Sequence, residues 1–286
     1  MEYSARGTLV NGVTPILILL LLGPPVVAQT PKPKNNLIQS IALCNGSDRI
    51  SPEPQITGCT ALIDSGAHTA AVAIAYNNRG DAYTAKGDFD RAIQDFDQSI
   101  KLNPTNARPL NNLGAAYLKK GEYDLAIKNL DEAIRLNPKY TKAFVNRAET
   151  YQRKSEYDRA ARDYDEAIRL EPGLKAVWNG RCWIRAILGE LQSALEDCNK
   201  ALQLEPNDPA TYDSRGLIYV KMSQFDAAID NYNSALRLEP KLASALYGRG
   251  VAKLKNGDKT GGDADISAAK TIQATIGDDF THYGVQ

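Results

Sequence analysis

Residues 73–106 read AIAYNNRGDAYTAKGDFDRAIQDFDQSIKLNPTN, and this 34-residue stretch decides the fold because its pattern occurs six times. The six segments are 73–106, 107–140, 141–174, 175–208, 209–242 and 243–276. A small residue stands at the eighth place of every segment, and alanine or glycine stands at the twentieth. Five segments carry proline at the thirty-second place: Pro104, Pro138, Pro172, Pro206 and Pro240. A fixed period of this length predicts supersecondary units that stack on their neighbours.

Each segment predicts two antiparallel helices joined by a short turn. Two helices approach closely only where side chains are small, so Gly80 and Ala92 mark the crossing point in the first segment. The large side chains of Tyr76 and Phe96 then fill the space around that point. Pro104 ends the second helix, because proline lacks an amide proton and disfavours helix in the residue before it.

The pattern also resembles a known family signature. In the first segment the matching residues are Tyr76-x-x-Arg79-Gly80-x-x-Tyr83, then Ala92-x-x-x-Phe96 and Pro104. This pattern resembles that of the tetratricopeptide-repeat (TPR) family, and it recurs in register over residues 73–276. The resemblance implies an all-α fold, a right-handed superhelix (α-solenoid) of antiparallel helix pairs with six TPR repeats. It also implies a non-catalytic scaffold that binds a protein or peptide partner in a concave groove.

The two ends of the repeat array are expected to differ from its middle. Residues 37–72 predict an N-terminal capping hairpin, because residues 55–66 match a second helix in phase but the rest is degenerate. In the last repeat, Asp263 and Lys270 replace aliphatic residues, which predicts that stacking stops there. The C-terminal tail, 277–286, is too short for another hairpin, and it resembles the tails of exported bacterial TPR proteins.

Residues 1–28 have the organisation of a signal peptide. An apolar run from Ile16 to Leu22 precedes Val26-Val27-Ala28, which predicts cleavage after Ala28. The run is shorter than the ~20 residues that span a bilayer, so no stable membrane span is expected after cleavage. An uncleaved anchor or a buried helix is the alternative. Residues 29–36 predict a flexible linker, and the mature chain is expected to be periplasmic or secreted.

Four cysteines fit an oxidising compartment. Four cysteines allow three connectivities, and local pairing is the simplest: Cys44 with Cys59, and Cys182 with Cys198. Each bridge would contribute about 3 kcal/mol in the chain-entropy estimate. Free buried thiols are the alternative, and metal binding is disfavoured because neither pair has CxxC spacing.

A recurrent arginine predicts ion pairs within the repeats. The seventh place of five segments is arginine, where TPR proteins commonly carry leucine. Four of those segments also carry an acidic residue at the twenty-third place. The predicted pairs are Arg79–Asp95, Arg147–Asp163, Arg181–Asp197 and Arg249–Asp265.

The composition gives no sign of an enzyme or a nucleic-acid-binding protein. Lys+Arg and Asp+Glu both number 34, so a broad basic surface for nucleic acid is not expected. The hydrolase and nucleotide-binding signatures are absent, and we expect no catalytic residue, cofactor or metal site.

The candidate site is therefore the concave groove that the first helices would line. Lysine, arginine and asparagine at groove positions suit a peptide backbone or acidic side chains, and ordinary solvated surface is the alternative. These polar candidates are Asn77, Asn111, Lys119, Arg153, Asn179, Lys221 and Lys255. A two-carboxylate clamp of the kind that some TPR domains use for chaperone tails is not expected, because Asp81 would repel a carboxylate.

An apolar set completes the candidates: Trp183, Ile187, Leu217 and Val220. An aromatic residue flanked by aliphatic ones is typical of a binding hot spot, and packing between repeats is the alternative. The sequence leaves two main functions open, and an enzyme is a distant third because no catalytic groups are found. One is a protein- or peptide-binding scaffold in the cell envelope, and the other is a structural accessory protein that self-associates.

Overall fold

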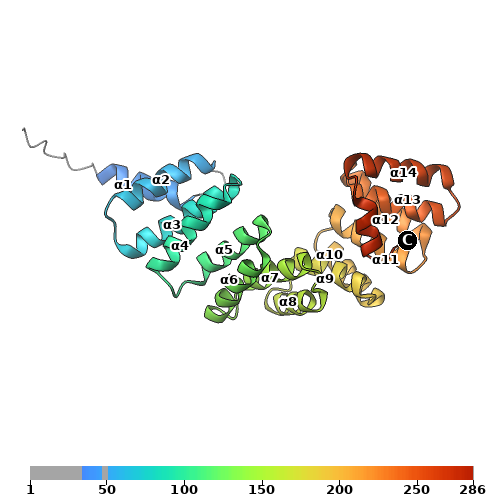
Figure 1. Cartoon of the computed structure of the whole chain (residues 1–286), viewed down its shortest axis with the longest axis horizontal. Helices are drawn as coiled ribbons and strands as arrows, with labels where there is room; N and C mark the ends of the chain where they lie inside the picture. The colour runs from blue at the N-terminus through green and yellow to red at the C-terminus, as the bar shows by residue number, and fades with distance from the viewer. Residues whose placement is uncertain (1–33, 47–50, 286) are drawn as a thin grey trace, which may run out of the picture.

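The computed structural model describes residues 34–46 and 51–285, and the helices follow one another along an arc (Figure 1). Within these residues the chain forms fifteen helices and no strand. The predicted signal peptide, 1–28, and residues 29–33 of the predicted linker lie outside the described residues. None of the helices in the described ranges is both long and apolar enough to cross a bilayer.

Six consecutive helix pairs occupy the six repeating segments. The first helices are α3 (Thr69–Ala85), α5 (Ala107–Lys120), α7 (Thr141–Arg153), α9 (Lys175–Leu188), α11 (Pro209–Lys221) and α13 (Ala243–Lys255). The second helices are α4 (Phe89–Leu102), α6 (Tyr123–Leu136), α8 (Tyr157–Leu170), α10 (Leu191–Leu204), α12 (Phe225–Leu238) and α14 (Lys259–Ile272). In five pairs the first helix begins at the first residue of its segment. The exception is α3, which begins four residues early because the His68 ring accepts a hydrogen bond from the amide of Ala70 and caps the helix.

The ends of the array carry three further helices. At the N-terminus α1 (Lys34–Asn45) and α2 (Pro52–Asp64) form a leading pair, and α1 begins inside the segment expected to be linker. At the C-terminus the tail forms one short helix, α15 (Ile276–His282). Asp263 and Lys270 on α14 are exposed, so the outer face of the last pair is polar.

Small residues set how closely the helices of a pair approach. A Cβ atom added at Gly80 would lie 2.6 Å from the Phe96 ring, and one added at Gly114 would lie 2.6 Å from Leu130. Real side chains do not tolerate such contacts, so these positions require glycine. Phe96 and Leu130 are themselves fully buried and form the centre of their pairs.

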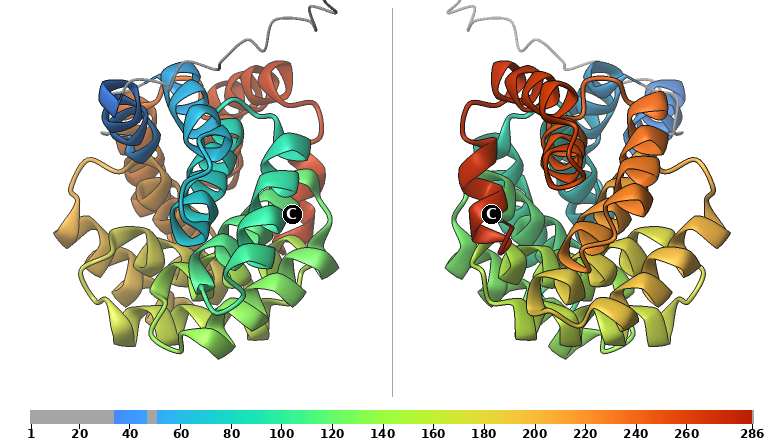
Figure 2. Two further views of the ribbon diagram at one scale, coloured as in Figure 1. Left: turned by 90° about the vertical axis from the view of Figure 1, so that its left-hand side faces the viewer. Right: turned by 90° about the vertical axis from the view of Figure 1, so that its right-hand side faces the viewer.

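The helices form two layers. The first helices of successive pairs contact one another, whereas no second helix contacts another second helix. The layer with closer neighbours lies on the inside of the curve, so α3, α5, α7, α9, α11 and α13 line the concave surface. Figure 2 shows both ends of the array on the same side of its middle, so the array is strongly curved.

The predicted arginine pairs are confirmed. In the third repeat, Arg147 Nε and Nη2 donate to the two carboxylate oxygens of Asp163 at 2.8 and 2.7 Å. Arg79, Arg181 and Arg249 form the same two-pronged pair with Asp95, Asp197 and Asp265. Bidentate pairing of this kind fixes the angle between the two helices of a repeat.

A third hydrogen bond of these arginines was not predicted. Arg147 Nη1 donates to Asp131 of the preceding repeat at 2.6 Å, and Arg181 Nη1 donates to Asp165 in the same way. Where the partners are neutral the arrangement persists, because Arg215 donates to both Asn231 and Asn199. Each arginine therefore joins the two helices of its own repeat to the second helix of the repeat before it.

Both predicted disulfides are present. Cys44–Cys59 joins α1 to α2 with a Cα–Cα distance of 4.4 Å, and Cys182–Cys198 joins α9 to α10 at 5.3 Å. All four sulfur-bearing residues are fully buried. The first bridge holds together the leading pair, and the second lies at the crossing point of the fourth repeat.

Candidate functional site

The concave surface begins at its N-terminal end with a network of amides. Asn112 Nδ2 donates to Asn77 Oδ1 at 3.1 Å and to Asp81 Oδ1 at 2.7 Å. Arg108 donates to the other oxygen of Asp81 at 2.9 Å. Desolvation raises the pKa of Asp81 more than Arg108 lowers it. A carboxylate at this point disfavours an anionic ligand.

The same network continues into the third repeat. Asn111 Nδ2 donates to Asn112 Oδ1 at 3.1 Å, and Asn111 Oδ1 accepts from Asn146 at 2.8 Å. Asn77 and Asn111 are both buried. These two candidates therefore link α3, α5 and α7 to one another and have little side-chain surface left for a ligand.

The middle of the concave surface holds two adjoining hollows of about 360 and 550 Å³. Both are lined by Glu149 and Arg153, and the smaller is also lined by the exposed Lys119. Desolvation raises the pKa of Glu149, against the opposing effect of Lys119 and Arg153. The lining thus carries both signs of charge, whereas only basic and amide side chains were predicted to line the groove.

Asn179 lies in the larger hollow. Its Oδ1 atom is buried and accepts no hydrogen bond within the described residues. A buried acceptor without a donor costs about 1–3 kcal/mol. The Asn179 oxygen has almost no exposed surface, so a ligand reaches it only if the side chain moves. The side-chain oxygens of Asn77 and Asn111 differ, because they already accept hydrogen bonds from Asn112 and Asn146.

The apolar candidates adjoin the larger hollow, and Trp183 is part of its lining. Leu217 and Val220 are buried, and Trp183 and Ile187 are half-buried against the same cluster. The cluster also contains Ile276, Phe280 and Val285 from the C-terminal tail. Trp183 meets Tyr157 edge-on at 6.0 Å between ring centroids and Tyr283 at 5.2 Å.

Lys221 ends this part of the groove. Its ammonium group donates to the carbonyl oxygen of Ala186 at 2.7 Å and to that of Tyr283 at 2.9 Å. Both carbonyls lie near helix C-termini, where a positive charge is favourable. Desolvation lowers the pKa of Lys221. The remaining basic candidate, Lys255, is exposed at the end of α13 and lines neither hollow.

The groove also contains an acidic side chain that the sequence analysis did not single out. Asp213 lines the larger hollow and accepts a hydrogen bond from Ser244 at 2.7 Å. Desolvation raises its pKa to about 7, against the lowering effect of Ser244. Its charge therefore changes near neutral pH.

Comparison with known proteins places the chain in a family. The pattern described as "TPR repeat" matches residues 80–121 and 216–257, and two described as "Tetratricopeptide repeat" match 107–140 and 145–209. Together these matches cover more than half of the chain. The chain belongs to the tetratricopeptide-repeat family. No curated protein matches the sequence of this TPR chain.

Solved structures with the same fold include several TPR proteins. One from Parabacteroides merdae is 17% identical, with 87% of this chain and 98% of that chain covered and a TM-score of 0.66. Pseudomonas aeruginosa pilF is 16% identical, with 74% and 98% covered and a TM-score of 0.63. YrrB, described as "a TPR protein with an unusual peptide-binding site", is 20% identical, with 66% and 95% covered and a TM-score of 0.50.

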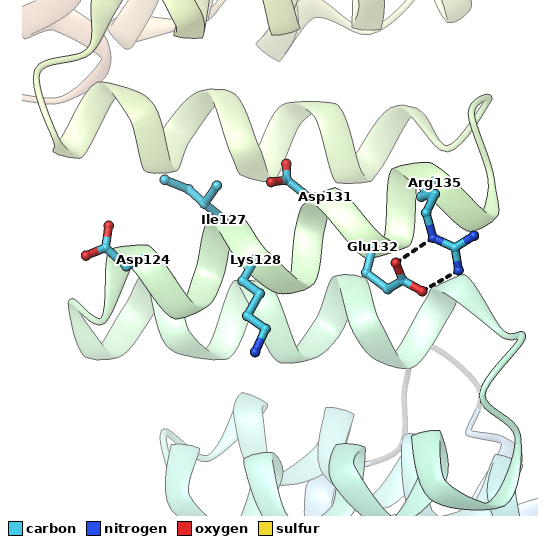
Figure 3. A pocket seen from close by; sticks show the side chains of 6 residues that line it. All are labelled: Asp124, Ile127, Lys128, Asp131, Glu132 and Arg135. Atoms are coloured by element: carbon cyan, nitrogen blue, oxygen red, sulfur yellow. Dashed lines mark hydrogen bonds and ion pairs between the residues drawn. The ribbon is translucent and has the colours of Figure 1, made fainter.

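The outer layer of the TPR array has a different character. A hollow of about 530 Å³ there is lined entirely by residues of α6, among them Asp131, Glu132 and Arg135 (Figure 3). Glu132 pairs with Arg135, and Asp131 pairs with Arg147. The acidic residues that line this hollow form ion pairs within the protein, so we assign no ligand to it.

The residues that sequence analysis missed come from the tail and from two repeat positions. Phe280 and Tyr283 contact the groove although the tail was expected only to end the chain. A signal was present, because apolar residues at 276, 280 and 283 have the spacing of one helix face. Glu149 and Asp213 gave no such signal, since isolated acidic residues are common on exposed helices.

Proposed function

We propose that this TPR chain is a non-catalytic scaffold that binds a peptide segment of another protein in its concave groove, outside the cytoplasm. The observation that carries the proposal is the pair of adjoining hollows between α5 and α11, with the polar side chains of Lys119, Glu149 and Arg153 in their lining. Such side chains suit the N–H and C=O groups of an extended peptide backbone. TPR proteins generally mediate protein–protein interactions, and the peptide-binding site described for YrrB supports the same use of the fold here.

The lining residues indicate the kind of peptide. Lys119 and Arg153 line the hollows together with Glu149, and Asp213 also lines the larger one. Charges of both signs favour a peptide that itself carries both signs, and they disfavour a strongly acidic one. The proposed ligand is therefore an extended segment with mixed charge, held mainly through its backbone.

A location in the cell envelope follows from the predicted signal peptide and fits the two disulfides. Disulfides form and persist in oxidising compartments such as the periplasm. Expression of the whole chain in a Gram-negative host tests this part of the proposal. We expect the protein in the periplasmic fraction, with the mass of a chain whose first residue is Gln29. A full-length cytoplasmic product would contradict it.

Selection of random displayed peptides on the mature chain tests the binding proposal. The variant Arg153→Glu reverses the charge shared by both hollows. The matched control, Arg162→Glu, makes the same change at an exposed residue of the outer helix α8. We expect the selected peptides to bind wild type and the control with equal affinity. Their affinity for Arg153→Glu should be lower by about tenfold or more. Equal binding to all three proteins would refute a groove site.

Self-association is the second candidate function, and one observation favours it. The side chains of Leu37, Ile38 and Ile41 on α1 are 39%, 70% and 39% exposed. An exposed apolar helix face at the end of a solenoid suits contact with another copy. Light scattering on the mature chain tests this candidate. A stable oligomer that Ile38→Glu converts to a monomer would support it, and a monomeric wild type would exclude it.

A further inference from the structure

The C-terminal tail is packed against the concave surface of the TPR array. Ile276, Phe280 and Val285 are buried, with 3%, 2% and 7% of their surfaces exposed. The tail lies beside helices from the middle of the chain, since the rings of Tyr283 and Trp183 of α9 are 5.2 Å apart between centroids. A segment with so few residues buries three apolar side chains only because the concave surface receives them.

The contacts of the tail extend beyond those of a terminal cap. A helix that merely ended the stack would contact the last pair, as Phe280 does with Tyr247 of α13 at 4.8 Å between ring centroids. Tyr283 instead reaches Trp183 of the fourth repeat, and His282 Nε2 lies 3.0 Å from the Tyr157 hydroxyl of the third. The tail therefore crosses the groove and contacts four repeats.

Lys221 binds the backbone of the tail and not one of its side chains. Its ammonium group binds the Tyr283 carbonyl, and within the described ranges no carboxylate lies within ion-pair distance of it. A desolvated ammonium without a carboxylate is best satisfied by carbonyl oxygens at the end of a helix. Any segment that ends a helical turn at this point can supply them.

We propose that residues 276–285 are an intramolecular ligand, and that Trp183, Leu217, Val220 and Lys221 form a docking surface for a protein segment of the same chemistry. That segment is a short helix with aromatic residues at positions i and i+3, an apolar residue at i−4, and a terminal carbonyl directed at Lys221. This inference rests on the proposed peptide-binding function and identifies one class of partner. The tail and the partner compete for one surface, so the affinity of the tail determines the affinity that a partner needs to displace it.

The length of α15 makes such exchange feasible. The helix has seven residues, and isolated helices of that length are unstable in water. Its order depends on the groove, so release costs only the contacts described above. Because the tail is tethered, its effective concentration is about millimolar and a free ligand must outcompete it.

A labelled peptide of sequence 273–286 tests the proposal in trans against the full mature chain. The variant Phe280→Ala/Tyr283→Ala weakens the tail and leaves the docking surface intact. The control Asp278→Ala/Thr281→Ala changes two exposed residues of the same helix. By fluorescence anisotropy we expect the first variant to bind the peptide about tenfold or more tightly than wild type, and the control to match wild type. Adding Trp183→Ala to the first variant should abolish the gain.

Equal affinity of all variants would overturn the proposal. Hydrogen exchange on wild type provides a second test that needs no substitution. Exchange of the amides of residues 276–285 should accelerate when excess peptide displaces the tail, and unchanged exchange would refute displacement. A concentration-dependent dimer in which tails are exchanged, detected by light scattering, would refute an intramolecular ligand. The two surfaces adjoin at Trp183, but the variants distinguish the proposals: Arg153→Glu leaves the tail sequence unchanged, and Phe280→Ala/Tyr283→Ala leaves Arg153 unchanged.

Discussion

The substitution Arg147→Leu tests the arginine pairs that join the repeats. In wild type, Arg147 makes three short charge-assisted hydrogen bonds, two to Asp163 and one to Asp131. The Asp163 side chain is 7% exposed and the Arg147 side chain is 19% exposed. Removing one partner of a buried pair leaves an uncompensated charge, which costs about 3–5 kcal/mol. We expect a loss of this size in the free energy of unfolding, measured by urea denaturation with circular dichroism.

The second repeat supplies a natural neutral version of this pair. It carries Leu113 and Asn129 at the same two places, and Asn129 donates to the Leu125 carbonyl at 2.8 Å. The double variant Arg147→Leu/Asp163→Asn reproduces that arrangement. We expect it to recover all but about 1 kcal/mol, because no buried charge remains.

An exposed pair of equal length serves as the control. Arg135 and Glu132 lie 2.6 Å apart, but their side chains are 67% and 41% exposed. Because solvent screens such pairs, Arg135→Leu should cost less than about 1 kcal/mol. The reasoning is refuted if Arg147→Leu is no more destabilising than Arg135→Leu, or if Asp163→Asn fails to rescue it.

Three further predictions concern the core and the groove. Replacing Cys182 and Cys198 by alanine should lower the free energy of unfolding by about 3 kcal/mol, seen as a lower Tm; an unchanged Tm would mean that the bridge does not form. Gly216→Ala should cost about 1–3 kcal/mol in the same assay, because its Cβ would lie 2.7 Å from the Tyr232 ring; wild-type stability would show that the helices can separate. The pKa of Asp213 is raised to about 7 from an ordinary 3.8. Between these two pH values the folded chain holds a proton that the unfolded chain has released, so the stability of the protein falls as the pH rises through this range. Asp213→Asn should therefore raise stability at about pH 8 by on the order of 2 kcal/mol, and have little effect at about pH 4; an equal effect at both would contradict the shift.

The fold could be predicted from the sequence because the small residues and the prolines indicate the same helix pairs. Small residues such as Gly80 and Ala92 occur where the helices must touch, and proline follows each second helix except the last. The ion pairs were also predictable, since Arg147 and Asp163 are 16 residues apart in a known hairpin. The reach of the same arginine to Asp131 was missed, because contact between repeats depends on the curvature of the stack and not on spacing alone.

The candidate site was predictable only in outline. Sequence spacing placed Asn77, Asn179 and Trp183 on the concave surface, but it did not show which of them already have partners. Asn77 is satisfied by Asn112, while Asn179 keeps a buried acceptor. The covering of Trp183 by Tyr283 joins residues 100 positions apart, and no local pattern reports such a contact.

The central claim is that the concave surface holds a polypeptide segment. The most direct measurement is an amide NMR titration of the mature chain with a peptide selected on it. The account predicts that the largest chemical-shift changes lie on α5, α7, α9 and α11, around Arg153 and Asn179, while exposed residues of the outer helices such as Arg162 stay unchanged. Shifts confined to the outer helices, or to the exposed face of α1, would contradict it.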